Sequence, residues 1–384
     1  MFFELTEAQR QLRDTAREFA DKILMPNADR YDRLEEFPQE NIEKLADLGF
    51  MGMLIPEEHG GSGAGNVSLT VALEEIQRGC ASTGVTVSVH NSLLSNPLIQ
   101  FGSAQQQKKY LPRLASGEWL GAYAITEPDH GSDAVAIETT CRREGDRYIL
   151  NGTKAWITNG SRADVIVTFA TVDPSLRSRG ICAFIVEKGF PGFTVGKKEK
   201  KLGIRASDTV ELVFEEMEVP AENLLGEEGG GFKIAMHTLD GGRVGIATQA
   251  VGIAQACLDA SIAHAGEYKQ FGRLLRDSQL VQHRIANMAM EIEAARLLTL
   301  RAASLKDLGV PNTREASVAK LYASECATRA ARDAVQIHGG FGMCRGFAVE
   351  RLFRDAKITE IYEGTSEIQR LVISRSCFPR DDGR

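Results

Sequence analysis

The segment RYILNGTKAWIT, residues 147–158, carries the clearest local fold signal in the chain. Two runs of strand-like residues, 147–150 and 153–157, flank Asn151-Gly152, the dipeptide preferred in two-residue hairpin turns. The pattern therefore predicts a β-hairpin. Further β-branched or apolar runs bounded by turn-forming residues follow at 165–171, 181–186 and 209–214. The middle of the chain is thus predicted to form a small β-barrel or β-sandwich domain.

Helical patterns lie on the N-terminal side of this region. Thr6 and Gln9 have the spacing of a capping box, and apolar residues then recur at helical spacing as far as Pro26. We expect the first helix to end at that proline. Two further helices are predicted over residues 38–48 and 68–78.

Helical periodicity returns after Gly229-Gly230-Gly231. The stretches 232–265, 279–308 and 313–337 contain little internal Gly or Pro and exceed the usual length of globular helices. An apolar stripe in the second of them contains Leu280, Ile285, Met288, Ile292 and Leu297. The predicted fold class is α+β with three domains: an N-terminal α-helical domain (1–119), a middle β domain (120–228) and a C-terminal four-helix bundle (229–384).

The composition argues against some classes of protein. The chain has 384 residues, 43% of them apolar, and its 45 Lys and Arg against 52 Asp and Glu give a net charge of −7. The acidic balance argues against a nucleic-acid-binding protein. No apolar run approaches the length of a membrane helix, so no membrane insertion is expected. The N-terminal sequence lacks the basic start and apolar core of a signal peptide.

The cysteines and histidines give no metal-binding pattern. Seven cysteines are scattered without a CxxC, and seven histidines without an HExxH. We interpret the cysteines as small buried side chains in a reducing compartment and expect no metal. A GxGxxG between strand and helix is also absent from the sequence, so a redox cofactor would need a geometry other than the Rossmann site.

Four segments carry candidate chemistry, and each has an ordinary structural explanation as well. Residues 123–133 combine a strand end with a polar turn, and 156–158 place Trp156 and Thr158 on one strand face. Residues 336–343 contain three glycines after a long helix. Residues 362–370 place Glu363 before Gly-Thr-Ser, where Thr365 or Ser366 would cap a helix. Glu363 would be a general base if an apolar pocket raised its pKa toward neutrality.

Taken together, these segments resemble the acyl-CoA dehydrogenase family. The motifs ITEP…GSD (125–133), WITNG (156–160), Q…GG.G (336–342) and RDAKI..IYEGTS (354–366) occur in family order and at family-like spacing. The resemblance runs from about residue 3 to residue 377. It implies FAD-dependent α,β-dehydrogenation of an acyl-CoA thioester, with electrons passed to an electron-transferring flavoprotein.

The resemblance also implies the site residues. Glu363 would be the catalytic base, and substrate would contact Ser132, Asp240, Arg243 and Gly364. FAD would contact two groups of residues, the second of which would reach FAD held by a neighbouring subunit in a homo-oligomer that is commonly a tetramer. The first group is Tyr123, Ile125, Thr126, Gly131, Ser132, Trp156, Ile157, Thr158, Thr365 and Glu367, and the second is Tyr268, Phe271, Gln279, Gln336, Gly339 and Gly340.

The sequence departs from the family at a few positions. Tyr268 stands where an arginine usually pairs with the FAD pyrophosphate, so weaker FAD retention is expected unless Lys269 or another cation substitutes. Some members carry the base at the position of Gly242, which has no side chain to serve, and this leaves Glu363 as the candidate.

The sequence also bears on the acyl group and the electron acceptor. Residues 86–93 resemble the short-chain and branched-chain branches and contain no arginine for a dicarboxylic acyl group. A short or branched acyl-CoA is therefore expected. An oxidase using O2 and a non-catalytic assembly factor on the same scaffold remain as alternatives. The predicted location is a bacterial cytoplasm or, after processing, the mitochondrial matrix.

Overall fold

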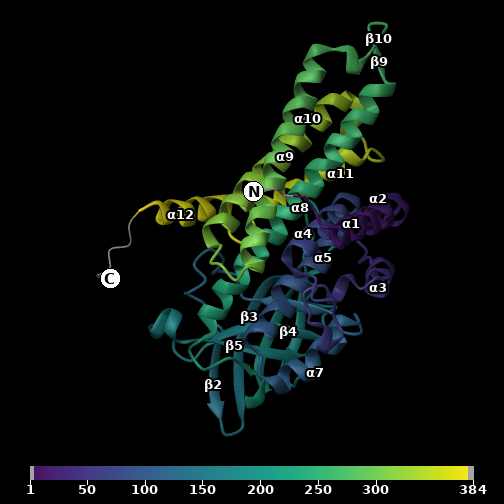
Figure 1. Ribbon diagram of the computed structural model, residues 1–384. Helices are drawn as coiled ribbons and strands as arrows, with labels where there is room; N and C mark the ends of the chain where they lie inside the picture. The colour runs from purple at the N-terminus through teal and green to yellow at the C-terminus, as the bar shows by residue number, and fades with distance from the viewer. Residues whose placement is uncertain (1–3, 379–384) are drawn as a thin grey trace.

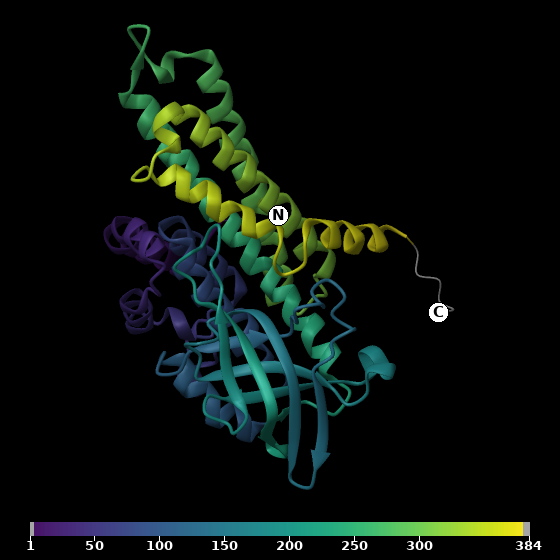
Figure 2. The same cartoon turned by 180° about the vertical axis from the view of Figure 1, so that it is seen from behind.

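The computed structural model describes residues 4–378. Figure 1 shows a long helical bundle, containing α8, α9 and α10, that rises from a twisted β-sheet, while the N-terminal helices pack beside α8 at the junction. Figure 2, from behind, shows the sheet at one end and the free tip of the bundle at the other. The fold is thus helical, then β, then helical along the chain, as the sequence predicts. The predicted boundaries after residues 119 and 228 stay predictions.

The N-terminal region is built of short helices. They are α1 (Glu7–Phe19), η1 (Ala20–Leu24), α2 (Met25–Leu34), α3 (Gln39–Asp47), η2 (Phe50–Gly52), η3 (Glu57–His59), α4 (Gly65–Gly79), α5 (Ala81–Ser88), η4 (Val89–Ser95), α6 (Asn96–Phe101) and α7 (Ala104–Ala115). The capping box at Thr6 is confirmed, with Gln9 as its partner. The helices predicted over 38–48 and 68–78 are confirmed by α3 and α4.

The prediction that Pro26 ends the first helix is wrong. The chain continues from α1 through the π-helical turn η1 into α2, and Pro26 lies at the start of α2. A proline is tolerated in a first helical turn because the missing N–H has no intrahelical partner there. The helix ends instead at Glu35, whose backbone is left-handed (φ 54°).

Eight strands of the middle region form one mixed sheet among the described residues. They are β1 (Gly121–Ala124), β2 (Thr140–Glu144), β3 (Arg147–Thr158), β4 (Val165–Thr171), β5 (Ile181–Glu187), β6 (Phe193–Lys198), β7 (Thr209–Pro220) and β8 (Leu224–Leu225), with η5 (Pro174–Arg179) and η6 (Ala221–Asn223) between them. The order is β6-β7-β3-β2-β4-β5-β8, and β1 pairs in parallel with β4. The predicted strands at 165–171, 181–186 and 209–214 are confirmed by β4, β5 and β7.

The predicted hairpin at Asn151-Gly152 is wrong. β3 runs without a turn from Arg147 to Thr158, and Gly152 lies at a shift in its register with β7. A Cβ at Gly152 would come within 2.5 Å of Thr139 Oγ1, so close approach to a neighbouring segment explains this glycine. The real hairpin turn is at Gly145-Asp146, between β2 and β3, and Gly145 has φ 63°.

The C-terminal region contains the three long helices that the sequence predicts. Its elements are α8 (Gly231–Glu267), β9 (Lys269–Gln270), β10 (Arg273–Leu274), η7 (Leu275–Asp277), α9 (Gln279–Asp307), α10 (Thr313–His338), η8 (Gly339–Met343), α11 (Ala348–Ala356), η9 (Lys357–Glu360) and α12 (Ser366–Cys377). Buried alanines on α8 and α10 let these helices pack closely, and α11 packs against both. In the predicted stripe of α9, Met288 and Ile292 are buried but Leu280 and Leu297 are exposed.

Helix α8 is long and apolar enough to cross a membrane, with mean hydropathy 1.2 in its most apolar window. However, 72% of that window is buried inside the protein, which is the environment of a core helix. Length and composition are therefore weak evidence for a membrane span here.

All seven cysteines are free, and five are buried. Within residues 4–378, no group of three His, Cys, Asp or Glu side chains is arranged to hold a metal ion.

Candidate active site

Glu363 lies in a strained turn between η9 and α12. Its backbone is left-handed (φ 55°), as is that of Gly364 (φ 89°). A non-glycine residue in this conformation costs free energy and persists where its surroundings hold it. Here Gln369 Nε2 donates to the carbonyl oxygens of Glu363 (3.0 Å) and Gly364 (2.9 Å), and Lys320 Nζ donates to that of Gly364 (2.8 Å). Two side chains therefore hold the turn that aims Glu363.

The Glu363 carboxylate points at α8. A Cβ at Gly242 would stand 2.4 Å from Glu363 Oε2 and 2.8 Å from Leu93 Cδ2, so a side chain at 242 and the present carboxylate would compete for one space. Although part of the residue is exposed, Oε2 is buried and has no hydrogen-bond partner in the described part of the chain. Burial raises the pKa of Glu363 to about 7, against the lowering charges of Arg243 and Lys320. Such a carboxyl is suited to take and return a proton near neutral pH.

Arg243 and Asp240 form an ion pair beside this carboxylate. Arg243 Nη1 donates to Asp240 Oδ1 at 2.7 Å, and Thr313 Oγ1 donates to Asp240 Oδ2 at 2.6 Å. An Asp and an Arg at i,i+3 on a helix can also form an ordinary surface ion pair. The pair does form, but Arg243 is only 6% exposed, and within residues 4–378 its Nε has no partner. A buried guanidinium with an unused donor suits an anionic or strongly polar ligand.

Tyr123 and Tyr362 complete the surroundings of Glu363. Tyr123, on β1, packs against Phe169 with ring centroids 5.2 Å apart, and its buried hydroxyl is unpartnered among the described residues. Burial and the nearby Glu363 charge raise the pKa of Tyr123 well above its usual value. Tyr362 donates to Gln249 of α8, which in turn donates to the Ala81 carbonyl at 3.3 Å. Strand β1, helix α8 and the C-terminal turn thus meet at one carboxylate.

The segment after β1 is tied to β3 by a buried ion pair. Lys154 Nζ lies 2.7 Å from Glu127 Oε1, and both side chains are almost fully buried. Glu127 also accepts the backbone N–H groups of Glu138 (2.6 Å) and Thr139 (3.0 Å). In addition, the Ala155 N–H donates to the Thr126 carbonyl at 2.9 Å. Together these contacts fix Thr126 next to the end of β3.

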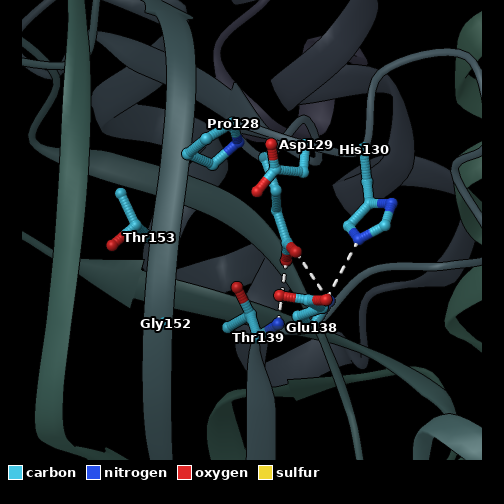
Figure 3. A pocket seen from close by; sticks show the side chains of 8 residues that line it. Pro128, Asp129, His130, Glu138, Thr139, Gly152 and Thr153 are labelled. Carbon is cyan, nitrogen blue, oxygen red and sulfur yellow. Dashed lines mark hydrogen bonds and ion pairs between the residues drawn. The ribbon is translucent and has the colours of Figure 1, made fainter.

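A polar hollow of about 300 Å³ is lined by this segment and by β3. Its lining includes Glu127, His130, Glu138 and Thr139, and Figure 3 shows His130 reaching toward Glu138, whose Oε1 lies 3.3 Å from His130 Nε2. Glu363 does not line it. The hollow is therefore separate from the carboxylate that the sequence predicts to act.

The remaining predicted residues of the first group surround these elements. Trp156 lies in a bulge of β3 (φ 56°) with its side chain 55% exposed, Thr158 is half-buried beside it, and the Ile157 side chain packs in the β core instead. Gly131 and Ser132 are exposed in the loop after β1. Thr365 caps α12 by accepting the Ile368 N–H, and Glu367 is exposed in the first turn.

The second group of predicted residues lies elsewhere. Tyr268, Phe271, Gln279, Gln336, Gly339 and Gly340 are at the free tip of the bundle, where Figure 1 shows β9 and β10. Helix α8 separates that tip from the site, because the 24 residues from Arg243 to Glu267 span about 36 Å at ~1.5 Å per residue. The structure does not bring this group to Glu363 within one chain.

The tip is aromatic. Tyr268 stacks on His264 (centroids 5.0 Å apart), which stacks on His338 (4.2 Å), while Phe271 is fully exposed in a left-handed turn. Burial lowers the pKa of both histidines. Lys269, the cation named as a substitute for the usual arginine, is exposed on β9.

Sequence reasoning missed Lys320, Gln369, Gln249 and Lys154. A signal existed for the two lysines. Lys320 follows Ala316 and precedes Ala323 and Ala327 on the buried face of α10, and a lysine seldom occupies such a face without a role. Lys154 occupies an inward position of a β-strand. Gln249 and Gln369 carry no comparable signal, because glutamine is common on either side of a helix.

Comparisons with known proteins agree with this arrangement. Family models match residues 6–118 (acyl-CoA dehydrogenase, N-terminal domain), 122–217 (middle domain) and 229–378 (C-terminal domain). The mitochondrial short-chain specific acyl-CoA dehydrogenase of Rattus norvegicus is 52% identical over 97% of this chain and 90% of its own length. The short-chain specific acyl-CoA dehydrogenase of Clostridium acetobutylicum is 49% identical over 98% of this chain and 100% of its own.

Solved structures give the same result. Butyryl-CoA dehydrogenase from Megasphaera elsdenii superposes with a TM-score of 0.96 at 45% identity, covering 98% of this chain and 100% of that one. The three matched regions and these full-length similarities establish the expected oxidoreductase activity and its cofactor, FAD. The chain belongs to the acyl-CoA dehydrogenase family.

Proposed function

We propose that this enzyme oxidises a short or branched acyl-CoA to the trans-2-enoyl-CoA, with Glu363 as the base. The observation that carries the proposal is the Glu363 carboxylate itself: its Oε2 is buried, is without a hydrogen-bond partner in the structure as described, and faces the one glycine of α8 that leaves it room. Burial holds its pKa near 7, so the ionised form is available at neutral pH while protonation remains accessible.

The residues of the first group fit an FAD. Tyr123 offers a buried hydroxyl that has no hydrogen-bond partner among residues 4–378. The exposed Trp156 ring offers a flat face for a heterocycle, and Thr158 beside it offers a hydroxyl. Thr126 is held in place by Ala155, and Thr365 and Glu367 stand at the start of α12. Gly131 and Ser132 supply an exposed loop with room for phosphate, since a Cβ at Gly131 would meet nothing within 4 Å. When bound, FAD supplies the acceptor for the hydride.

The chain's own residues perform the proton chemistry. Glu363 takes the α-proton of the thioester, the α C–H electron pair forms the new C=C bond, and the β-hydride departs with its own electron pair. The backbone N–H of Glu363 donates to the thioester oxygen as negative charge develops there. Gly364 leaves the backbone open beside that oxygen, and Asp240, Arg243 and Ser132 bind the CoA portion.

The second group of residues supports a homo-oligomer, which we propose to be a tetramer. These residues are about 36 Å from the Glu363 site along α8, so they reach FAD only if the FAD belongs to another subunit. Phe271 and Leu280 are exposed apolar side chains at this tip, and both views show α12 projecting away from the bundle. Exposed apolar surface of this kind is typical of a subunit interface.

Relatives support the substrate, the electron acceptor and the location. Several are named short-chain specific acyl-CoA dehydrogenases, from mitochondria and from bacteria, so either a bacterial cytoplasm or a mitochondrial matrix is consistent with the chain. A solved structure named for the electron transferring flavoprotein of Acidaminococcus fermentans superposes with a TM-score of 0.97 at 48% identity, covering 99% of this chain. We propose an electron-transferring flavoprotein as the acceptor.

The test is anaerobic mixing of the holoenzyme with a series of acyl-CoA thioesters while the flavin absorbance is followed. We expect bleaching to be fastest with a short or branched chain and to be abolished in Glu363→Gln, although dithionite still reduces the bound flavin. Glu293→Gln, an exposed change on α9, is the matched control. Near-normal bleaching in Glu363→Gln would remove this residue from its role, and a maximum at long chains would reject the substrate class.

A further inference from the structure

Lys320 is a buried lysine whose ammonium is hydrogen-bonded to a carbonyl, with no carboxylate among its hydrogen-bond partners in residues 4–378. Its side chain is fully buried on α10, and Nζ donates to the Gly364 carbonyl at 2.8 Å. A buried ammonium loses the favourable hydration of its charge unless nearby charge offsets that loss. The Lys320 ammonium on α10 thus contacts Gly364, the residue that follows Glu363 in the turn.

The charged groups around Lys320 come from two directions. Glu363, Glu360 and Glu367 face it from the C-terminal segment, and Arg243 faces it from α8. Burial lowers the pKa of Lys320 to about 8, although Glu363 and Glu360 act to raise it. The ammonium form therefore prevails at neutral pH. Its charge and that of Arg243 both lower the pKa of Glu363 against the effect of burial.

We propose that Lys320 is a positioning residue for Glu363: its ammonium holds the left-handed Glu363–Gly364 turn and places a positive charge beside the carboxylate. The inference rests on the proposed role of Glu363 as base. Gln369 shares the mechanical part, since its amide donates to both carbonyls of the turn, but it carries no charge. Lys320 differs from it by adding an electrostatic effect that a neutral donor cannot reproduce.

Two substitutions separate the two effects. Lys320→Gln retains an N–H donor and removes the charge, whereas Lys320→Met removes both at similar volume. Without the charge, the pKa of Glu363 rises, so the base becomes protonated at higher pH. Lys357→Met is the matched control, because Lys357 is an exposed lysine paired with Glu360 at 2.5 Å.

The measurement isolates proton abstraction from hydride transfer. The holoenzyme is incubated with acetyl-CoA in D2O, and exchange of the acetyl hydrogens is followed by mass spectrometry across a pH range. Acetyl-CoA has an α-carbon and no β-carbon, so a C–H bond breaks to protonate Glu363 and a deuteron returns from solvent, with no oxidation. Glu363→Gln is run in parallel.

We expect the acid limb of the exchange rate to move up by about one pH unit in both Lys320 variants. The high-pH plateau should fall about tenfold or more in Lys320→Met and less in Lys320→Gln, because only the former loses the donor. Lys357→Met should match the wild-type protein. Should Lys320→Met fail to fold, the acid limb of Lys320→Gln decides alone.

Two results would contradict the inference, and they can be told apart. An unmoved acid limb in Lys320→Gln, with exchange abolished in Glu363→Gln, overturns the role of Lys320 and leaves the base in place. Exchange that survives in Glu363→Gln overturns the proposed function, and the inference with it.

Discussion

The Glu363 turn and the tip of the bundle are both predicted to serve the same chemistry, yet they are built in opposite ways. The turn is enclosed by β1, α8 and α10, and its polar atoms include buried ones that are unpartnered in the described structure. The tip exposes Phe271 fully and stacks Tyr268 on His264 near the surface. One chain can thus supply the base and its buried charged neighbours by itself. The exposed residues at the tip, in contrast, need the surface of another subunit to form a cofactor site. Changes at the turn should alter rates, and changes at the tip should alter retention of FAD.

The largest effect is expected for Gly242→Ala. The new Cβ would lie 2.4 Å from Glu363 Oε2, so the carboxylate must move, and a displacement of this size costs about 100-fold in kcat. Gly241→Ala is the control, because the nearest atom to its Cβ would be the flexible end of Lys306, at 3.0 Å, and the Ser92 carbonyl oxygen would lie at an ordinary contact distance of 3.7 Å. Steady-state rates of the two variants give the comparison. Equal losses would show that Gly242 does not make room for the base.

The ion pair that fixes the segment after β1 is tested by Lys154→Met. Its partner Glu127 would be left buried without its cation, which destabilises a protein by about 3–5 kcal/mol. Urea unfolding measures the loss. Adding Glu127→Gln should recover part of it, since the uncompensated charge is removed. A loss below about 1 kcal/mol for the single change would mean that the pair does not hold the segment after β1 in place.

The burial of Glu363 should also appear in stability. Its folded pKa is about 7 against a reference near 4.5, so between these values the folded state binds more protons and stability falls as pH rises. Glu363→Gln should therefore raise stability at pH 8 by on the order of 2 kcal/mol relative to wild type, and by much less at pH 4. Thermal melts at both pH values test this, with Glu293→Gln as the reference. The same gain at both would contradict it.

The smallest effect is expected at the tip. Tyr268→Arg restores a cation that the family usually has, and we expect FAD to dissociate from diluted holoenzyme up to about tenfold more slowly, from one charge-assisted hydrogen bond. Lys269→Met tests whether the exposed neighbouring lysine already substitutes for that cation. No slowing in Tyr268→Arg would defeat the idea that Tyr268 weakens FAD retention.

Local sequence predicted what local forces control. The capping box at Thr6, the extents of α3, α4 and β4, and the three long helices follow from neighbouring hydrogen bonds and periodicity. Asn151-Gly152 makes no turn, since β3 runs straight through it. A glycine stands there because a Cβ would clash with Thr139. Pro26 does not end a helix, because the π-helical turn η1 ends at Leu24 and Pro26 lies in the first turn of α2, where its missing N–H needs no partner.

For the candidate site too, some features were predicted from the sequence and others depend on the tertiary structure. The motif around Glu363 was readable from sequence and family resemblance, and so was the charge of Arg243. Only the tertiary structure placed Gly242, Lys320 and Glu363 together, from three segments far apart in the chain. The shift in the pKa of Glu363 follows from that enclosure, since desolvation and Coulomb interactions depend on distance in space and on burial, which the order of residues along the chain does not specify.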